Sequence, residues 1–404
     1  MRGWLAVGLA VGMTAVQAVP VHEYRLENGM KVLVKEDHRA PVMVSQVWYK
    51  VGSSYEVDGI TGISHVLEHM MFKGTEQYPA GEFSRIISDN GGSENAFTAQ
   101  DYTAYFQTME KSRLPVSFAL EADRMRNLVL PEDEFLKEVQ VVMEERRMRT
   151  EDNPQSLTYE QFSATAWASS PYRTPIIGWM DDLENLAVDD LRNWYQQWYG
   201  PDNATLVVVG DVDPEEVHRQ AQKYFGPLEA SEVVAPKPRL EMAQRGMKRI
   251  EVKAPAELPY LLMGYKVPVV RTAELQWEPY ALAVLAGVLD GGTAARLESQ
   301  LVRGGEIAAS AGASYDAYDR LDSLFLLSGT PATGYNMEDL ERAFVDQIRK
   351  LQDEPVTSAE MDRVVAQISA EKVYEQDSIF YQAMQIGSLE TVGLSWKDAD
   401  RYLE

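Results

Sequence analysis

A short apolar segment that carries two histidines and a glutamate, residues 62–72, constrains this chain more than any other feature. His65 and His69 are four residues apart, so a helix places both imidazoles on one face, about one turn apart. Glu68 falls on the same side of such a helix. Because two imidazoles and a carboxylate are costly to bury in so apolar a segment without a partner, we expect a metal ion there.

The order of these residues, His-x-x-Glu-His, is a signature of one class of zinc peptidases. Zn²⁺ can bind two neutral imidazoles and one carboxylate, and its fourth position then holds a water that Glu68 can deprotonate. The alternative is that His65 and His69 are ordinary helix residues beside a surface glutamate. Two of the chain's five histidines fall in this one turn, which favours the metal site.

A third ligand has to come from elsewhere, and the helix predicted over residues 131–149 offers one. Its start is typical of helices, with Pro131 in the first turn and three acidic residues after it. Glu138 and Glu145 are seven apart and share a face, whereas Glu144 is turned about 100° away. Taken alone, a glutamate in so acidic a helix is usually a solvated charge, so the spacing leaves the assignment open.

With these residues in view, the chain resembles the M16 metallopeptidases, the family of pitrilysin, insulin-degrading enzyme and the mitochondrial processing peptidase. In that family the H-x-x-E-H motif is followed by a helix of the form E-x-x-x-x-x-x-E whose second glutamate binds zinc, as Glu138 and Glu145 are arranged here. The resemblance covers about residues 22–404 and is strongest in the first half. Further matching segments are residues 72–75 (Phe-Lys-Gly-Thr), 91–98 (Gly-Gly-Ser-Glu-Asn-Ala-Phe-Thr) and 203–211.

The resemblance implies a zinc endopeptidase that hydrolyses peptides or extended protein segments. His65, His69 and Glu145 would hold one Zn²⁺ per chain, with Glu68 as the general base and Glu138 as an auxiliary catalytic carboxylate. Family members bind substrate as an added strand along the segment that matches Asn95 and Ala96, which makes these two residues candidate substrate-binding residues. From the sequence alone, this segment could equally be a sheet strand that binds no ligand.

The resemblance also implies an α+β fold of two related α/β sandwich domains, of the LuxS/MPP-like metallohydrolase type. Its sheets would be mostly antiparallel, with helices packed on one face. We expect a zinc-binding peptidase domain over residues 19–228 and a related domain without metal over residues 248–404. Residues 229–247 read as a linker, because they have two prolines, mixed charge and no period. Relatives continue further, so the resemblance predicts more chain after residue 404.

The second half cannot supply an equivalent metal site, because no histidine follows His218. Its expected role is to close over the first half and form a cleft. Active family members carry an Arg and, about six residues on, a Tyr that help to hold the scissile carbonyl. Arg303 matches the Arg and is a candidate substrate-binding residue, while Ala309 stands in place of the Tyr. A partner chain could supply that stabilisation, either a zinc-less homologue in a heterodimer or a second copy of this chain.

Composition excludes several classes of protein. A chain of 404 residues is long enough for two domains, and 45% hydrophobic with 25% charged residues describes a globular protein. The net charge of −24 argues against nucleic-acid binding, since phosphate would be repelled. It could steer basic peptides to the protein, or reflect acids spread over solvated faces. Without cysteine there is neither a disulfide nor thiol catalysis.

The first residues read as a secretory signal peptide. Arg2 precedes an apolar stretch that ends in small residues, which predicts cleavage after Ala18 and removal of residues 1–18. A membrane anchor would need nearer to 20 apolar residues. We therefore expect export to the periplasm of a Gram-negative bacterium, with peptides as substrates and no stable membrane anchor.

A second class of function stays open at this point. The chain could be a weakly catalytic or non-catalytic M16-like subunit that acts in binding or assembly with a partner chain. Glu68 favours the enzyme, because a scaffold has no need of a base.

Overall fold

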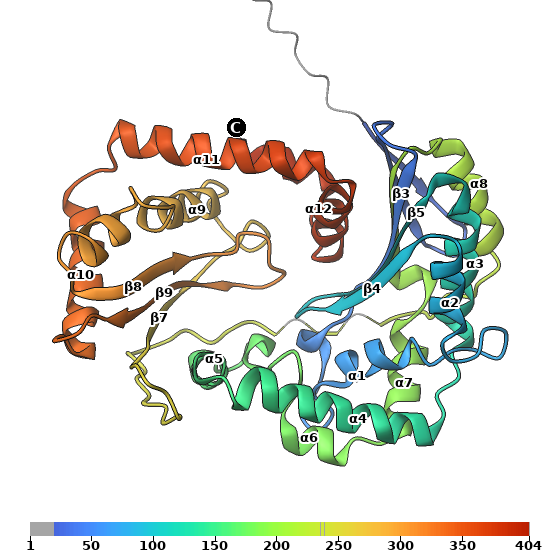
Figure 1. Cartoon of the computed structure of the whole chain (residues 1–404), viewed down its shortest axis with the longest axis horizontal. Helices are drawn as coiled ribbons and strands as arrows, with labels where there is room; N and C mark the ends of the chain where they lie inside the picture. Colours follow the sequence, from blue (N-terminus) through green and yellow to red (C-terminus); the bar gives the residue numbers. More distant parts are fainter. Residues whose placement is uncertain (1–19, 235, 238, 404) are drawn as a thin grey trace, which may run out of the picture.

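A computed structural model of the chain describes residues 20–234, 236–237 and 239–403 (Figure 1). The signal peptide predicted over residues 1–18 lies outside these residues. Among the helices within the described ranges, none is both long and apolar enough to cross a membrane.

The first half of the chain builds a six-stranded sheet. Its strand order is β1-β2-β6-β3-β5-β4, and every neighbouring pair is antiparallel except β2 and β6. A hairpin at Asn28-Gly29, a sequence that favours such turns, joins β1 to β2, and Gly29 has the positive φ of 95° that the turn needs. The strands are β1 (Val21–Arg25), β2 (Lys31–Glu36), β3 (Val42–Tyr49), β4 (Ser93–Thr98), β5 (Thr103–Glu110) and β6 (Ala204–Gly210).

Eight α-helices lie among the described residues of this first lobe, and the apolar faces of all of them except α5 form its main core with one face of the sheet (Figure 1). Trp194 and Trp198, which lie four residues apart, are both buried in that core, as their helical spacing predicts. The helices are α1 (Ile63–Met70), α2 (Glu82–Asp89), α3 (Leu114–Asn127), α4 (Glu132–Arg146), α5 (Pro154–Ala166), α6 (Met180–Asn185), α7 (Val188–Trp198) and α8 (Pro214–Tyr224).

The other face of this sheet is covered by a helix from the far end of the chain, α12 (Ile379–Thr391). Ala383 and Ile386 of α12 join a buried apolar cluster with side chains of the sheet, including Trp48. A Cβ atom at Gly387 would lie 2.1 Å from the Trp48 ring, so only glycine allows this close packing. Coverage of both faces explains why every residue of β6 is buried.

The second lobe has a smaller antiparallel sheet of order β7-β9-β8 with its own apolar core. Both sheets are thus largely antiparallel with helices packed on them, and the predicted α+β fold class is confirmed. Its elements are β7 (Leu261–Val267), α9 (Glu278–Leu289), β8 (Ala308–Ser314), β9 (Ser323–Pro331), α10 (Met337–Asp353) and α11 (Ser358–Asp377).

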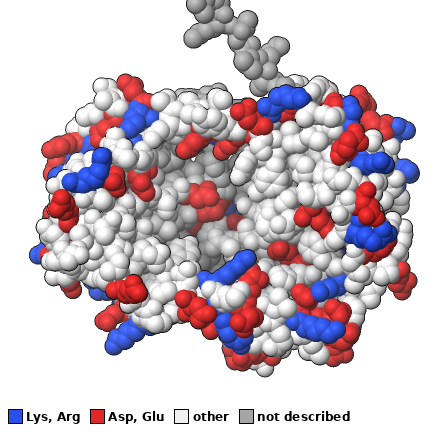
Figure 2. Space-filling model, in the orientation of Figure 1, with Lys and Arg blue, Asp and Glu red and all other residues white. Residues whose placement is uncertain are grey.

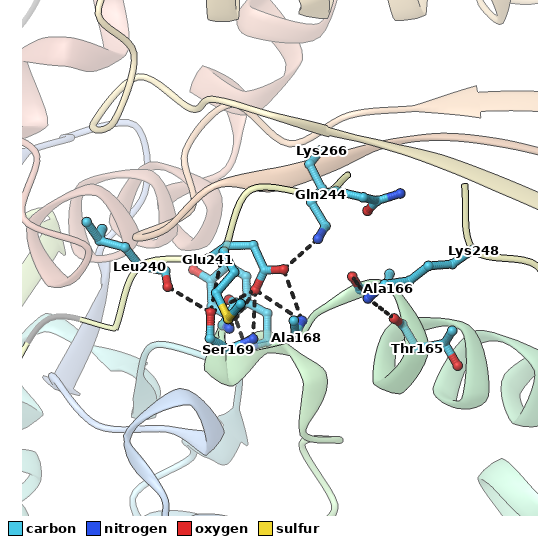
Figure 3. Close-up of polar contacts among 12 residues, drawn as sticks. Thr165, Ala166, Ala168, Ser169, Leu240, Glu241, Gln244, Lys248 and Lys266 are labelled. Carbon is cyan, nitrogen blue, oxygen red and sulfur yellow. Dashed lines mark hydrogen bonds and ion pairs between the residues drawn. The ribbon is translucent and has the colours of Figure 1, made fainter. Parts of the chain in front are cut away.

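The connection between the lobes has no helix or strand from residue 228 to residue 260 among its described residues, yet it is anchored. The carboxylate of Glu241 accepts backbone N–H groups of Ala168, Ser169 and Ser170 at 2.8–3.1 Å. Lys266 of β7 approaches the same carboxylate at 2.5 Å (Figure 3). These bonds help to hold the pKa of Glu241 at about 2, so the linker is tied to both lobes by a charged group.

Candidate metal centre

The N-terminus of α1 is held by a buried carboxylate. Glu56 accepts the N–H groups of Gly62 at 2.7 Å and Ser64 at 2.9 Å, which satisfies donors that a helix start leaves without partners. Burial raises the pKa of Glu56 to about 7. Gly62 has a φ of 86°, a left-handed conformation that suits glycine at this sharp entry. The helix that carries the two histidines is therefore fixed at its first turn.

The structure brings together the three residues that the sequence singled out as ligands. The Glu145 carboxylate lies 3.9 Å from His65 Nε2 and 3.5 Å from His69 Nε2. One potential ligand atom from each residue lies within 4.8 Å of the others. Tetrahedral zinc with bonds of about 2.0–2.2 Å requires ligand atoms about 3.3–3.6 Å apart. The three side chains fit a mononuclear centre after small adjustments.

The chemistry of the donors also fits a metal ion. Burial lowers the pKa of His65 to about 3, with further contributions from His69 and Arg149, so its imidazole is neutral at pH 7. The neutral imidazole is the form that binds a metal. His65 Nδ1 is buried with no hydrogen-bond partner among the described residues, while its Nε2 is turned toward Glu145.

Glu68 lies beside this cluster and is held by a neighbouring strand. Thr98, the last residue of β4, donates its hydroxyl to Glu68 Oε2 at 2.5 Å. Burial raises the pKa of Glu68, and the Thr98 bond and the charge of His69 oppose that rise. A carboxylate with a raised pKa is better matched to proton transfer near neutral pH.

Two contacts around the cluster orient its members. Glu138 lies 3.2 Å from His69 Nδ1 and 2.5 Å from Lys73 Nζ, so it can fix the imidazole with its Nε2 toward Glu145. Arg149 pairs with the second oxygen of Glu145 at 2.7 Å. Sequence reasoning did not identify Lys73, Thr98 or Arg149. The four-residue spacing of Glu145 and Arg149 on one helix was the available signal for the last of these.

The candidate substrate-binding strand is next to the centre. β4 ends the strand order and pairs with β5 alone among the described strands, so its outer edge is open. Asn95 is exposed on this edge, and its side chain accepts the Ala96 N–H at 2.9 Å. The bond from Thr98 to Glu68 places this edge beside Glu68.

The structure does not bring Arg303 into contact with this cluster. Its guanidinium donates to the carbonyl of Thr293 and lies 3.5 Å from Glu298, both in the second lobe. Ala309 is exposed at an irregularity in β8, where the register shifts between Ala308 and Ser310. A role of Arg303 in substrate binding stays a prediction.

Two lobes in one chain, with a histidine–histidine–glutamate cluster on α1 and α4 of the first, define a fold and site typical of metallopeptidases. The family model described as Insulinase (Peptidase family M16) matches residues 31–179. The model described as Peptidase M16 inactive domain matches residues 185–368. The zinc protease PqqE of Helicobacter pylori is 36% identical over 366 residues, which cover 89% of this chain and 81% of that protein. The chain belongs to peptidase family M16, and the resemblance seen in the sequence is confirmed.

Solved structures give the same result. A crystal structure of a protease from Helicobacter pylori matches with a TM-score of 0.89 at 33% identity, over 95% of this chain and 92% of that one. The periplasmic protease PqqL from Escherichia coli matches with a TM-score of 0.77 at 20% identity, over 96% of this chain and 45% of that one. At that identity the second match speaks for the fold alone.

Proposed function

We propose that this chain is a zinc-dependent endopeptidase that hydrolyses peptides or extended protein segments. The observation that carries the proposal is the convergence of His65, His69 and Glu145 from two helices, with Glu68 beside them. The name of the Helicobacter pylori relative, a zinc protease, supports zinc as the ion. We propose one Zn²⁺ per chain, held by these three side chains.

The residues around the centre have distinct roles in this proposal. A bound Zn²⁺ supplies a Lewis acid that polarises the scissile carbonyl and makes a water more acidic. Glu68, oriented by Thr98, takes a proton from the attacking water and gives it to the departing amine. Glu138 holds His69 in the orientation that leaves its Nε2 free for the metal.

The open edge of β4 supports binding of an extended substrate. A peptide that adds to this edge as a further strand gains backbone hydrogen bonds whatever its side chains are. Figure 2 shows that the molecule is hollowed between its lobes, with acidic side chains exposed in the hollow. With a net charge of −24, this surface would attract cationic rather than anionic segments.

Metal removal tests the proposal. The purified chain is assayed for zinc content and for cleavage of a mixed peptide library, then again after chelation and after zinc is restored. We expect cleavage that disappears with the metal and returns with it. A metal-loaded chain that cleaves nothing in the library, alone or with a homologous partner, would refute the endopeptidase.

A proline at position 96 tests the strand edge. Ala96→Pro removes the N–H that Asn95 now accepts, and a bound strand would lose that donor. We expect KM to rise about tenfold, the equivalent of losing one hydrogen bond of about 1.4 kcal/mol, with zinc content unchanged. Ala96→Ser keeps the N–H and is the matched control. An unchanged KM in the proline variant, with the melting temperature of the parent, would argue against binding at this edge.

The alternative function is a weakly catalytic or non-catalytic subunit that acts in binding or assembly. It is favoured by Ala309, which stands where active relatives are expected to carry a tyrosine. The zinc-less homologue or second copy that would complete such a site stays a prediction, as does export to the periplasm.

A further inference from the structure

We propose that Arg320, from the second lobe, is a positioning residue for the centre in the first lobe. It joins two first-lobe segments, one that leads into the metal helix and one that follows the substrate edge. These segments are residues 52–56, which lead into α1, and residues 99–102, which follow β4. The part of the inference that concerns turnover rests on the proposed endopeptidase function. The part that concerns the anchoring of these two segments rests on geometry alone.

Arg320 lies in the connection between β8 and β9, and its side chain contacts polar groups of the first lobe. Its Nε donates to Asp101 Oδ1 at 2.8 Å, and its terminal nitrogen donates to the Ser54 hydroxyl at 2.8 Å. The guanidinium lies over the Tyr55 ring, 4.3 Å from its centroid. Asp101 is 4% exposed at its side chain and Arg320 is 16% exposed, so water screens this ion pair little.

The Asp101 carboxylate accepts hydrogen bonds from three residues. Ser54 donates to Oδ1 at 2.6 Å, while the Arg320 backbone N–H at 3.2 Å and the Tyr172 hydroxyl donate to Oδ2. Tyr172 in turn accepts the backbone N–H groups of Arg320 and Leu321, each at 3.1 Å. Loss of Arg320 would leave a buried carboxylate without its cation, which is more costly than losing the same pair on the surface.

Residues 52–56 connect the Arg320 contacts to the metal helix through hydrogen bonds. Ser53 and Ser54 donate their N–H groups to the carbonyls of Ala99 and Gln100 at 3.2 and 2.8 Å. Gly52 is so close to this turn that a Cβ there would lie 2.2 Å from the Ala99 carbonyl oxygen. Two residues after Ser54, Glu56 holds the first turn of α1. Loss of the Arg320 contacts would therefore shift the start of the helix that carries His65 and His69.

The turn at residues 99–102 connects the Arg320 contacts to the substrate edge, because it follows β4 directly. It begins one residue after Thr98, whose hydroxyl holds Glu68, and Asp101 lies within it. An error of about 1 Å in the placement of a catalytic group can cost about 100-fold in rate. A second lobe without metal ligands can in this way affect turnover, because it fixes the end of β4 and the start of α1 together.

Other contacts keep the lobes together when Arg320 is changed. α12 packs on the first sheet, and Glu241 binds the backbone of residues 168–170 (Figure 3). An apolar cluster that includes Trp167, Tyr172 and Leu324 also crosses between the lobes. A variant at position 320 is thus a local change and not a separation of the lobes.

Arg320→Gln tests the proposal. The control is a second ion pair between the lobes, between β2 of the six-stranded sheet and α12. Lys31 of β2 pairs with Glu390 of α12 at 2.8 Å, with side chains 18% and 7% exposed. Lys31→Gln therefore removes a charge pair of similar burial whose partners, Glu390 and Glu23, lie outside residues 52–56 and 99–102. We expect Arg320→Gln to keep its zinc, to lower kcat/KM about 10- to 100-fold, and to exchange amide hydrogens faster over residues 51–64 and 95–104. Lys31→Gln should match the parent in all three. Arg320→Lys, which keeps the charge but not the forked geometry, should recover part of the loss.

Equal kcat/KM in Arg320→Gln and Lys31→Gln, whether both high or both low, would overturn the role in turnover. Unchanged exchange over the two segments would overturn the anchoring itself. If the parent cleaves no peptide, the proposed function fails and the exchange experiment alone decides the anchoring. If Arg320→Gln does not fold, Arg320→Lys is measured by the same three readouts and should show a smaller loss in the same segments.

Discussion

Glu68→Gln is expected to lower kcat for peptide cleavage by about 10²- to 10⁴-fold while the chain keeps its zinc, because it removes general acid–base catalysis and no ligand. Glutamine has nearly the same shape, and its carbonyl oxygen can still accept the Thr98 hydroxyl, so the local structure should persist. It cannot take a proton from water at neutral pH. The loss should fall on kcat more than on KM, since the base acts on the transition state.

The measurement is steady-state cleavage of a peptide identified from the library, with zinc determined on the same samples. Glu144→Gln is the control, because Glu144 is a neighbouring exposed carboxylate that pairs with Arg147 and lies outside the cluster. A Glu68→Gln chain that cleaves at the parental rate would contradict the role as base. A variant that instead loses its zinc would make Glu68 a ligand and would reopen the assignment of Glu145.

The centre could be predicted because its residues follow local rules. Four- and seven-residue spacings on helices put His65 beside His69 and Glu138 on the face of Glu145, and the structure brings both faces together. The family resemblance was still needed to choose Glu145, since an acidic helix offers several carboxylates. The edge position of β4 was implied by the family resemblance alone, since it depends on the order of all six strands.

The relation between the lobes could not be predicted in this way. Asp101 and Arg320 are 219 residues apart, and nothing in either neighbourhood marks the other as its partner. The apolar runs of β3 and β6 fit strands that are buried on both faces, but the pattern does not say that α12 supplies the second cover. Arg303 shows the reverse case, because the matching motif predicted a role in the cleft and the structure holds the side chain within its own lobe.

Glu145→Gln is expected to reduce zinc affinity by more than about 100-fold, since removal of a ligand should exceed the 10- to 100-fold cost of removing a group that orients one. An amide oxygen carries no charge to offset the cation, and it would leave Arg149 without its 2.7 Å partner. Cleavage should then fail at zinc concentrations that saturate the parent and should partly return at much higher zinc. In these respects Glu145→Gln differs from Glu68→Gln, which should keep zinc and regain no activity at any zinc concentration.

Zinc per chain after dialysis against a weak chelator measures this effect directly, and thermal unfolding measures it independently. A ligand at 100 times its Kd stabilises the folded state by about 2.7 kcal/mol, so added zinc should raise the Tm of the parent and of Glu144→Gln but not that of Glu145→Gln. The comparison of residues 144 and 145 is informative because the two glutamates are adjacent on α4 and differ in direction by about 100°. If both variants kept zinc equally, α4 would contribute no ligand, and the two histidines would need a different third partner.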